Sequence, residues 1–330
     1  MSGVAGTSPG GPSQGGLALA RIVREPIVPL IGLLLALVAA LHVIQPELDT
    51  PSWVARTIRF ATPLAILGAA QTLVMLTGGI DLSVASVASM AAYLAATRSS
   101  SDGDVVAILI GLGAASAVGL INGIGVAIFR VQPLIMTLGM GLVVAGFLTV
   151  YQTLAVASAA SVPDPIAWLG GGTSFGFFPN SLFLFLPLAA VILFGLRRSG
   201  FGRLLYAIGD NSVAARLAGV KVWQVLLVAY VLAGLLAGIA GLMISALANA
   251  AALGLADTYL LPSVAAVVIG GTSIFGGRGG YAGSIVGALI LTVLVSLLTV
   301  MDAPNAVRQI LYGTIILVVA AAYTRVTGNT

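Results

Sequence analysis

The chain has 330 residues, of which 59% are hydrophobic and only 7% are charged, and its formal net charge is +4. Soluble domains carry about a quarter charged residues, so this composition excludes a soluble globular protein. The mean hydropathy is +1.13 and the apolar runs are long enough for helices, which predicts an all-α polytopic membrane protein. Cysteine is absent, so disulfides and thiol chemistry are excluded.

The N-terminal residues 1–20 are rich in glycine, serine and proline, which predicts a disordered tail. We expect the remainder, 21–330, to form a single transmembrane domain. Its first apolar run, Ile27–Ile44, follows Arg21 and Arg24. A cleaved signal peptide is the alternative for this run, but 18 residues is long for that purpose, so we expect a first membrane span.

Residues 60–97 form an apolar run that is interrupted at LTGGIDLS, Leu76–Ser83. One helix over these 38 residues would be ~57 Å long, nearly twice the hydrocarbon thickness, so we expect two spans. A later segment, 260–272, is short and contains Pro262, which predicts a broken or half-crossing helix. The predicted spans number about ten: 27–44, 60–76, 82–97, 105–129, 133–152, 182–196, 224–250, 260–272, 281–301 and 307–323.

Basic residues orient these segments, because cytoplasmic loops of membrane proteins carry an excess of lysine and arginine. With the N-terminus inside, ten of the 14 basic residues fall in inner segments and four in outer ones. Fusing the second and third segments would place the basic loop 197–223 outside. The predicted topology is therefore ten spans with both termini in the cytoplasm.

Glycine spacings predict how the spans pack. Small residues four apart recur at Gly119/Gly123, Gly234/Gly238 and Gly283/Gly287. Such pairs let helix backbones approach closely in a membrane. We expect them to pack helices within one subunit and not to form a dimerisation motif.

Residue types that enzymes use are almost missing. The only histidine is His42, and the chain has no Cys/His cluster, HExxH or GxSxG motif. It also has no GxxxxGK[ST] loop, because its only lysine, Lys221, follows a valine. We therefore expect no enzymatic activity, no metal, no cofactor and no nucleic-acid partner. Energy for uphill transport would come from elsewhere.

Two glycine pairs interrupt apolar runs, one in each half of the chain: GGIDLS at Gly78–Ser83 and GGTSIF at Gly270–Phe275. Similar stretches follow each pair, VGLING and VGALIL, which indicates a weak internal repeat. Transporters are commonly built from such halves, with broken helices where they meet. The residues expected to form paired backbone interruptions near a translocation route are Gly78, Gly79, Asp81, Ser83, Gly270, Gly271 and Thr272.

Asp81 is the candidate for a titratable group that couples transport to an ion. It can instead accept hydrogen bonds from the free amides at the start of the next helix, with Gly79 allowing the turn. We favour helix capping. A role in ion coupling stays open, and Asp81 can have both roles if the interruption lines the translocation route.

The predicted cytoplasmic loop 197–223 reads RRSGFGRLLYAIGDNSVAARLAGVKVW and does not resemble a flexible linker. Asn211 can cap a short helix that ends at Gly219. With small side chains at Ala214 and Ala215, this helix suits docking into a cleft of a partner. The alternative is an ordinary basic loop that only determines the topology.

Three segments, LTGGIDLSVASV, YAIGDNSVAARLAGV and AAVVIGGTSIFGGRGG, resemble signature segments of the ribose-type permeases of ABC importers, in the branched-chain amino acid/ribose permease superfamily. The resemblance extends over about 27–323. It implies a permease subunit of the bacterial inner membrane that passes a monosaccharide or a similar small polar solute by alternating access. It implies three partners: a cytoplasmic ABC ATPase, a periplasmic sugar-binding protein and a second permease chain, identical or different.

The resemblance also identifies the helix of loop 197–223 as a coupling helix that rests in a groove of the ATPase. The matching positions are Asn211, Ala214, Ala215, Arg216, Ala218 and Gly219. Relatives often have acidic residues after the asparagine, where this chain has Ser212 and Val213.

Four polar residues within the predicted spans are candidates either to contact sugar hydroxyls or to bridge helices: Gln71, Asn122, Gln152 and Asn249. An ion-coupled secondary transporter or a channel, acting without ATP, is the alternative function.

Overall fold

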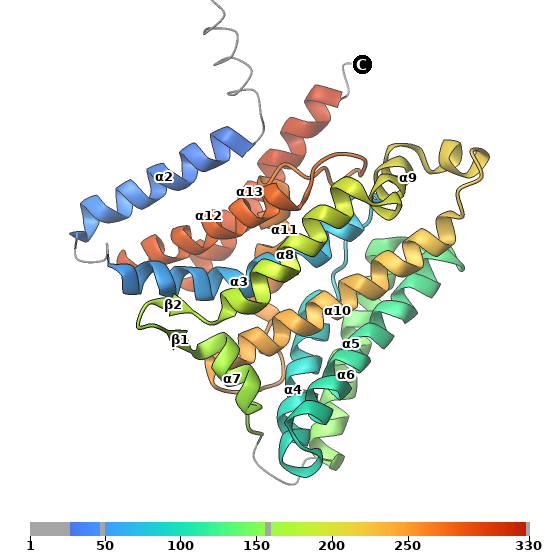
Figure 1. The fold of residues 1–330 in the computed structure, drawn as a ribbon. Coiled ribbons are helices and arrows are strands. Elements are labelled where there is room, and N and C mark those ends of the chain that lie inside the picture. The colour runs from blue at the N-terminus through green and yellow to red at the C-terminus, as the bar shows by residue number, and fades with distance from the viewer. Residues whose placement is uncertain (1–26, 47–49, 156–159, 328–330) are drawn as a thin grey trace, which may run out of the picture.

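The computed structural model describes residues 27–46, 50–155 and 160–327, and it is built almost entirely of helices (Figure 1). The predicted tail, 1–20, lies outside the described residues. The elements in chain order are α2 (Ile27–Ile44), α3 (Pro51–Met75), α4 (Val84–Asp102), α5 (Asp104–Ala127), α6 (Pro133–Ala155), α7 (Asp164–Gly171), β1 (Thr173–Ser174), β2 (Phe178–Pro179), α8 (Ser181–Arg198), α9 (Gly200–Leu217), α10 (Val222–Ala248), the 3₁₀ turn Asp257–Tyr259, α11 (Leu260–Ile269), α12 (Tyr281–Val300) and α13 (Asn305–Thr327).

Each of the ten predicted apolar segments contains a helix. Among the described residues, seven helices are long and apolar enough to cross a membrane: α2, α3, α5, α6, α8, α10 and α12. The all-α polytopic architecture is therefore confirmed.

The structure does not establish the count of ten spans or the internal repeat. The last turns of α4 contain Arg98 and Asp102, and α4 is not among the seven. Helix α11 has 10 residues and is ~15 Å long, about half the hydrocarbon thickness. The apolar part of α13, Asn305–Val318, is also short.

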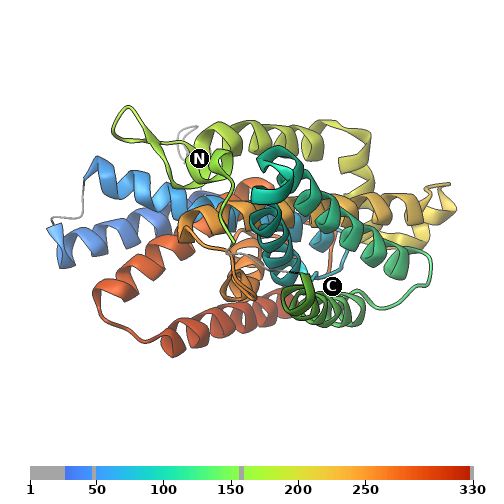
Figure 2. The ribbon, with the colours of Figure 1, turned by 90° about the horizontal axis from the view of Figure 1, so that it is seen from below.

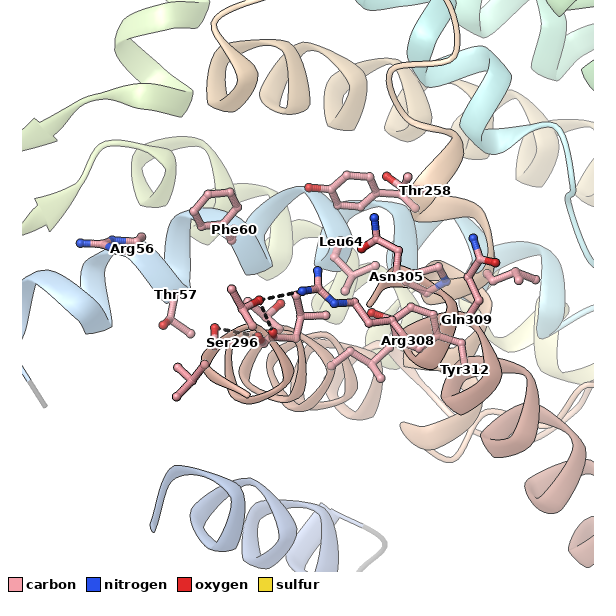
Figure 3. A pocket seen from close by; sticks show the side chains of 18 of the residues that line it. Arg56, Thr57, Phe60, Leu64, Thr258, Ser296, Asn305, Arg308, Gln309 and Tyr312 are labelled. Atoms are coloured by element: carbon pink, nitrogen blue, oxygen red, sulfur yellow. Dashed lines mark hydrogen bonds between the residues drawn. The ribbon is translucent and has the colours of Figure 1, made fainter. Parts of the chain in front are cut away.

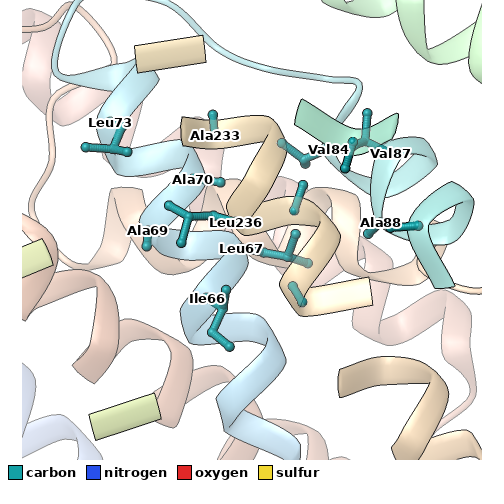
Figure 4. Close-up of a cluster of buried hydrophobic side chains, with 14 of the residues drawn as sticks. Ile66, Leu67, Ala69, Ala70, Leu73, Val84, Val87, Ala88, Ala233 and Leu236 are labelled. Carbon is teal, nitrogen blue, oxygen red and sulfur yellow. The ribbon is translucent and has the colours of Figure 1, made fainter. Parts of the chain in front are cut away.

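Helix α3 occupies the centre of the bundle. It packs against α10, α12 and α11, and most of its side chains are buried. Figure 4 shows Ile66 and Leu67 of α3 among buried apolar side chains of α4 and α10, such as Val84 and Leu236. Figure 2 shows α8 along one long side of the bundle and α13 along the other. A central helix in contact with so many neighbours can transmit a displacement to each of them.

The two ends of the bundle differ in structure. Helix α7 and the antiparallel pair of β1 and β2 lie at one end, and the kinked α9 lies at the other (Figure 1). Helix α2 lies on the outside of the bundle, where it packs along α12.

Glycines bring the helix backbones of one chain into direct contact, as predicted. A Cβ atom on Gly119 of α5 would lie 2.3 Å from the carbonyl oxygen of Tyr230 on α10. A Cβ on Gly234 would lie 2.4 Å from the oxygen of Ala115, and one on Gly287 would lie 2.0 Å from the oxygen of Ala266. These distances are too short for any side chain, so the pairs serve packing within the subunit.

We predict that Gly119→Ala destabilises the protein by ~1–3 kcal/mol, because the added methyl group forces α5 and α10 apart. Gly113→Ala on the same helix is the control, since a Cβ there meets no atom within 4 Å. Thermal unfolding in detergent, followed by size-exclusion of the fluorescently tagged protein, measures both. Equal midpoints for the two variants would contradict the close contact.

Candidate functional site

The first glycine pair ends α3. The amide of Gly78 donates to the carbonyl of Met75 (2.9 Å), and the amide of Gly79 donates to that of Val74 (3.2 Å). This is the Schellman arrangement, which satisfies the last carbonyls of a helix. It requires a left-handed residue, and Gly78 has φ of +80°.

The second glycine pair ends α11 with the same two bonds. The amide of Gly271 donates to Val268 (3.0 Å), and that of Thr272 donates to Val267 (3.1 Å). Here Gly271 is the left-handed residue, with φ of +84°. Gly271 is thus the counterpart of Gly78, while Gly270 keeps helical dihedrals. The two interruptions share a local structure, with the glycine pairs displaced by one residue relative to each other.

The two interruptions also touch. The amide of Gly277, in the loop after α11, donates to the carbonyl of Leu76 (3.0 Å). A Cβ on Gly276 would lie 2.8 Å from the amide nitrogen of Gly78. Segments about 200 residues apart in the chain therefore meet at their backbones.

Helix α9 is the third member of this contact. A Cβ on Gly209 would lie 1.9 Å from the carbonyl oxygen of Leu76 and 2.3 Å from the amide of Gly277. The hydroxyl of Tyr206 donates to the carbonyl of Gly279 (2.9 Å). We call the meeting point of 76–79, 206–210 and 276–280 the three-way junction.

Gln71 holds the segment that follows the first interruption. Its Nε2 donates to the carbonyl of Asp81 (2.7 Å), and its Oε1 accepts from the amide of Asp81 (3.3 Å). Gln71 is fully buried. One side chain thus satisfies both backbone groups of a residue that lies outside any helix.

The carboxylate of Asp81 is buried and accepts two hydrogen bonds from Ser83, one from its amide (2.8 Å) and one from its hydroxyl (2.6 Å). Asn122 of α5 in turn donates to the hydroxyl oxygen of Ser83 (2.9 Å). Ser83 directly precedes α4, so Asp81 closes the turn that leads into this helix, close to the predicted cap. Within the described residues, Oδ1 of Asn122 and the hydroxyl of the neighbouring Tyr230 are buried without a hydrogen-bond partner.

The four polar candidates therefore divide into two groups. Gln71 and Asn122 are buried and join α3 and α5 to the segment 81–83 that precedes α4, which is close to the helix-bridging role expected of them. Gln152 and Asn249 are exposed, near the ends of α6 and α10. Contact of any of the four with a solute remains a prediction.

The short helix predicted in loop 197–223 is the second half of α9. Asn211 has non-helical dihedrals, φ −156° and ψ 99°, and divides α9 there. Its Oδ1 accepts from the amides of Val213 (3.0 Å) and Ala214 (2.9 Å), so it is an N-cap. Gly219, with φ of +86°, follows the helix end.

The six positions that the resemblance assigns to the coupling helix do not face the same way. Ala215 is buried against the chain's own core. The other five are exposed: Asn211, Ala214, Arg216, Ala218 and Gly219. Two exposed apolar side chains on this helix were not predicted from the sequence, Val213 (58% exposed) and Leu217 (86% exposed). Their spacing of four residues on one helical face was the available signal.

A cavity of about 660 Å³ lies between α3, α11, α12 and α13 (Figure 3). Polar and aromatic side chains contribute to its walls, and none of its lining residues was among the candidate site residues predicted from the sequence.

Comparisons with known proteins agree on one family. A family model described as "Branched-chain amino acid transport system / permease component" matches residues 53–320. "Ribose import permease protein RbsC" of Bacillus subtilis (strain 168) is 33% identical over 305 residues, which cover 90% of this chain and 92% of that protein. "Fructose import permease protein FrcC" of Rhizobium meliloti is 31% identical over 301 residues, 89% of this chain and 84% of that protein.

A third relative is "Galactofuranose transporter permease protein YtfT" of Escherichia coli (strain K12). It is 36% identical over 266 residues, 78% of this chain and 76% of that protein. No solved structure matches the chain. The resemblance drawn from the three signature segments is confirmed.

We predict that Gln71→Leu destabilises the protein by ~1–3 kcal/mol, because it leaves the buried amide and carbonyl of Asp81 without partners. Gln152→Leu is the matched control, since Gln152 is exposed. Thermal unfolding in detergent compares the two variants. An unchanged midpoint for Gln71→Leu would show that the segment around Asp81 does not depend on this side chain.

Proposed function

The chain belongs to the branched-chain amino acid transport system / permease component family, and we propose that it is the membrane-spanning subunit of an ABC importer. It passes a monosaccharide or a similar small polar solute across the bacterial inner membrane by alternating access. Ten segments cross the membrane, with α4, α11 and α13 added to the seven long apolar helices, and both termini lie in the cytoplasm. The sugar class follows from the names of the relatives, which mention ribose, fructose and galactofuranose.

The three-way junction is the observation that carries this proposal. The exposed second half of α9 docks on a cytoplasmic ATPase, while its first half contacts both helix interruptions through Gly209. The contact has no room for a methyl group, so a movement of α9 toward the other two segments displaces Leu76 and Gly277. A movement driven by ATP thus reaches α3 and α11 directly, and their tilting opens the route to one side.

The remaining subunits are a periplasmic sugar-binding protein, which delivers the solute, and a second permease chain, identical or different. The chain lacks a phosphate-binding loop, which supports a separate ATPase as the energy source.

Co-purification tests the proposal. We predict that the tagged protein, extracted from its native membrane in mild detergent, retains an ABC ATPase that mass spectrometry identifies. In a variant with Val213→Asp and Leu217→Asp, recovery of the ATPase falls at least about tenfold, because two charges replace the apolar contacts of the docking face. Gln224→Asp, at an exposed position at the start of α10, is the control. Absence of an ATPase from the wild-type preparation would overturn the importer assignment.

Asp81 distinguishes the importer from an ion-coupled carrier, the alternative that a buried carboxylate in an apolar segment favours. We predict that Asp81→Asn keeps uptake of the transported sugar and its pH profile, at the expense of about 1 kcal/mol of stability. The amide oxygen of Asn can still accept the bonds from Ser83, although they become neutral and weaker. Uptake in cells that carry the whole transporter, measured from pH 5.5 to 8, checks this. Loss of uptake in a stable, ATPase-bound variant would favour ion coupling.

A further inference from the structure

Two buried polar atoms near the first interruption have no hydrogen-bond partner within the described residues. They are Oδ1 of Asn122 on α5 and the hydroxyl of Tyr230 on α10. Asn122 is 1% exposed and Tyr230 is 0% exposed, so bulk solvent reaches neither. Protein interiors satisfy nearly all such groups, and they often do so with an ordered water molecule. Two of these atoms at one place therefore indicate a ligand that is not part of the chain.

Ser83 determines how the amide of Asn122 is oriented. The Ser83 hydroxyl donates its only proton to Oδ1 of Asp81 (2.6 Å), so its oxygen is left to accept. Nδ2 of Asn122 donates to that oxygen (2.9 Å). Turning the amide over would place its acceptor against another acceptor. The Oδ1 atom of Asn122 therefore needs a donor from elsewhere.

The hydroxyl of Tyr230 reaches the same turn from α10. A Cβ on Gly79 would lie 2.9 Å from the hydroxyl oxygen. Gly78 is the left-handed residue of this helix end and Gly79 is not, so the backbone conformation does not require glycine at position 79. The close approach of Tyr230 does require it. The carboxylate of Asp81 also lies close enough to act electrostatically on the hydroxyl.

Asp81 supplies a third group with unused hydrogen-bonding capacity. Both bonds from Ser83 reach Oδ1 of its carboxylate, which leaves the lone pairs of Oδ2 for another donor. Asp81 is buried and forms no ion pair within the described part of the chain. A buried charge without a counter-charge is stabilised chiefly by the hydrogen bonds that it accepts.

We propose that Tyr230, Asn122 and Asp81 bind one buried water molecule. The water accepts a bond from the Tyr230 hydroxyl and donates its two protons, one to Oδ1 of Asn122 and one to Oδ2 of Asp81. Three bonds to groups that otherwise lack partners are typical of a buried water. One donor and two acceptors suit water, whereas a cation uses acceptors alone. The water joins α10 to the turn that precedes α4, a role that goes beyond the proposed function and does not depend on it.

Hydroxyl-radical labelling tests this site in the full-length protein in detergent. An X-ray pulse produces radicals from bound water as well as from bulk water, and mass spectrometry measures oxidation of the nearest side chains. Tyr281 is the control, because it is also buried and its hydroxyl donates to the carbonyl of Ala65 (3.2 Å). We expect Tyr230 to be oxidised at least about tenfold faster than Tyr281. Equally slow oxidation of the two rings would overturn the water site.

The variant Tyr230→Phe tests the same bond through the sign of a stability change. If the hydroxyl is bound to water, its removal loses a hydrogen bond, and we expect the thermal midpoint to fall by about 1–3 °C. If the hydroxyl has no partner, its removal replaces a buried polar group by an apolar one and raises the midpoint. Tyr281→Phe is the reference, because it loses the bond to Ala65. A raised midpoint for Tyr230→Phe would contradict the proposal.

Two other arrangements of this site give different results, and either would overturn the proposal. A sodium ion in place of the water makes the midpoint higher in sodium chloride than in choline chloride, whereas we expect equal midpoints at equal ionic strength. A direct bond from Tyr230 to Asp81 lowers the midpoint of Tyr230→Phe but leaves the Tyr230 ring unlabelled. None of these measurements needs an ATPase, so their failure is distinct from failure of the proposed function, which appears as a co-purification without an ATPase.

Discussion

The backbone contact among Leu76, Gly209 and Gly277 is the constraint on which the rest of the structure depends. A helix that ends inside a membrane protein exposes carbonyl groups that lipid cannot satisfy. Here α3 and α11 close themselves with Schellman bonds, and the remaining carbonyl of Leu76 accepts from Gly277. Each member of the contact is a backbone group, so the three segments can approach only because glycines remove the side chains. The same close approach of backbones therefore satisfies a carbonyl at the end of α3 and brings α9 into contact with the helix ends.

The side chains near the first interruption make the junction stiff. Gln71 holds both backbone groups of Asp81, and Ser83 and Asn122 continue the network to α5. A loop held in this way cannot absorb a displacement of α9 by bending. The displacement passes instead to whole helices, among them α3, which packs against α10, α12 and α11. The alternating access that we propose therefore takes place by tilting of intact helices.

Hydropathy and glycine placement predicted much of this from the sequence. The positions of ten helices, the left-handed ends near Gly78 and Gly271 and the cap at Asn211 all follow from local rules, because the cause of each lies within a few residues. The three-way junction could not be predicted, since residues 76, 209 and 277 are brought together by packing alone. Nor could the cavity, because single polar residues on α12 and α13 do not reveal that their faces meet. The span count stayed a prediction because α4 ends in charged residues and α11 is short.

The three-way junction and the cavity are connected through helix α3, which contributes residues to both. The cavity is lined by the first half of α3, and the junction lies at the end of α3 and in the loop that connects α11 with α12, so a movement of α9 reaches these three helices. The length of α11 matters for this connection. With 10 residues it is about half as long as the hydrocarbon is thick, and its glycine end at Gly271 lies five residues before the junction segment 276–280. The docking of an ATPase on α9 that we propose therefore acts on the end of α3 and on the loop between α11 and α12.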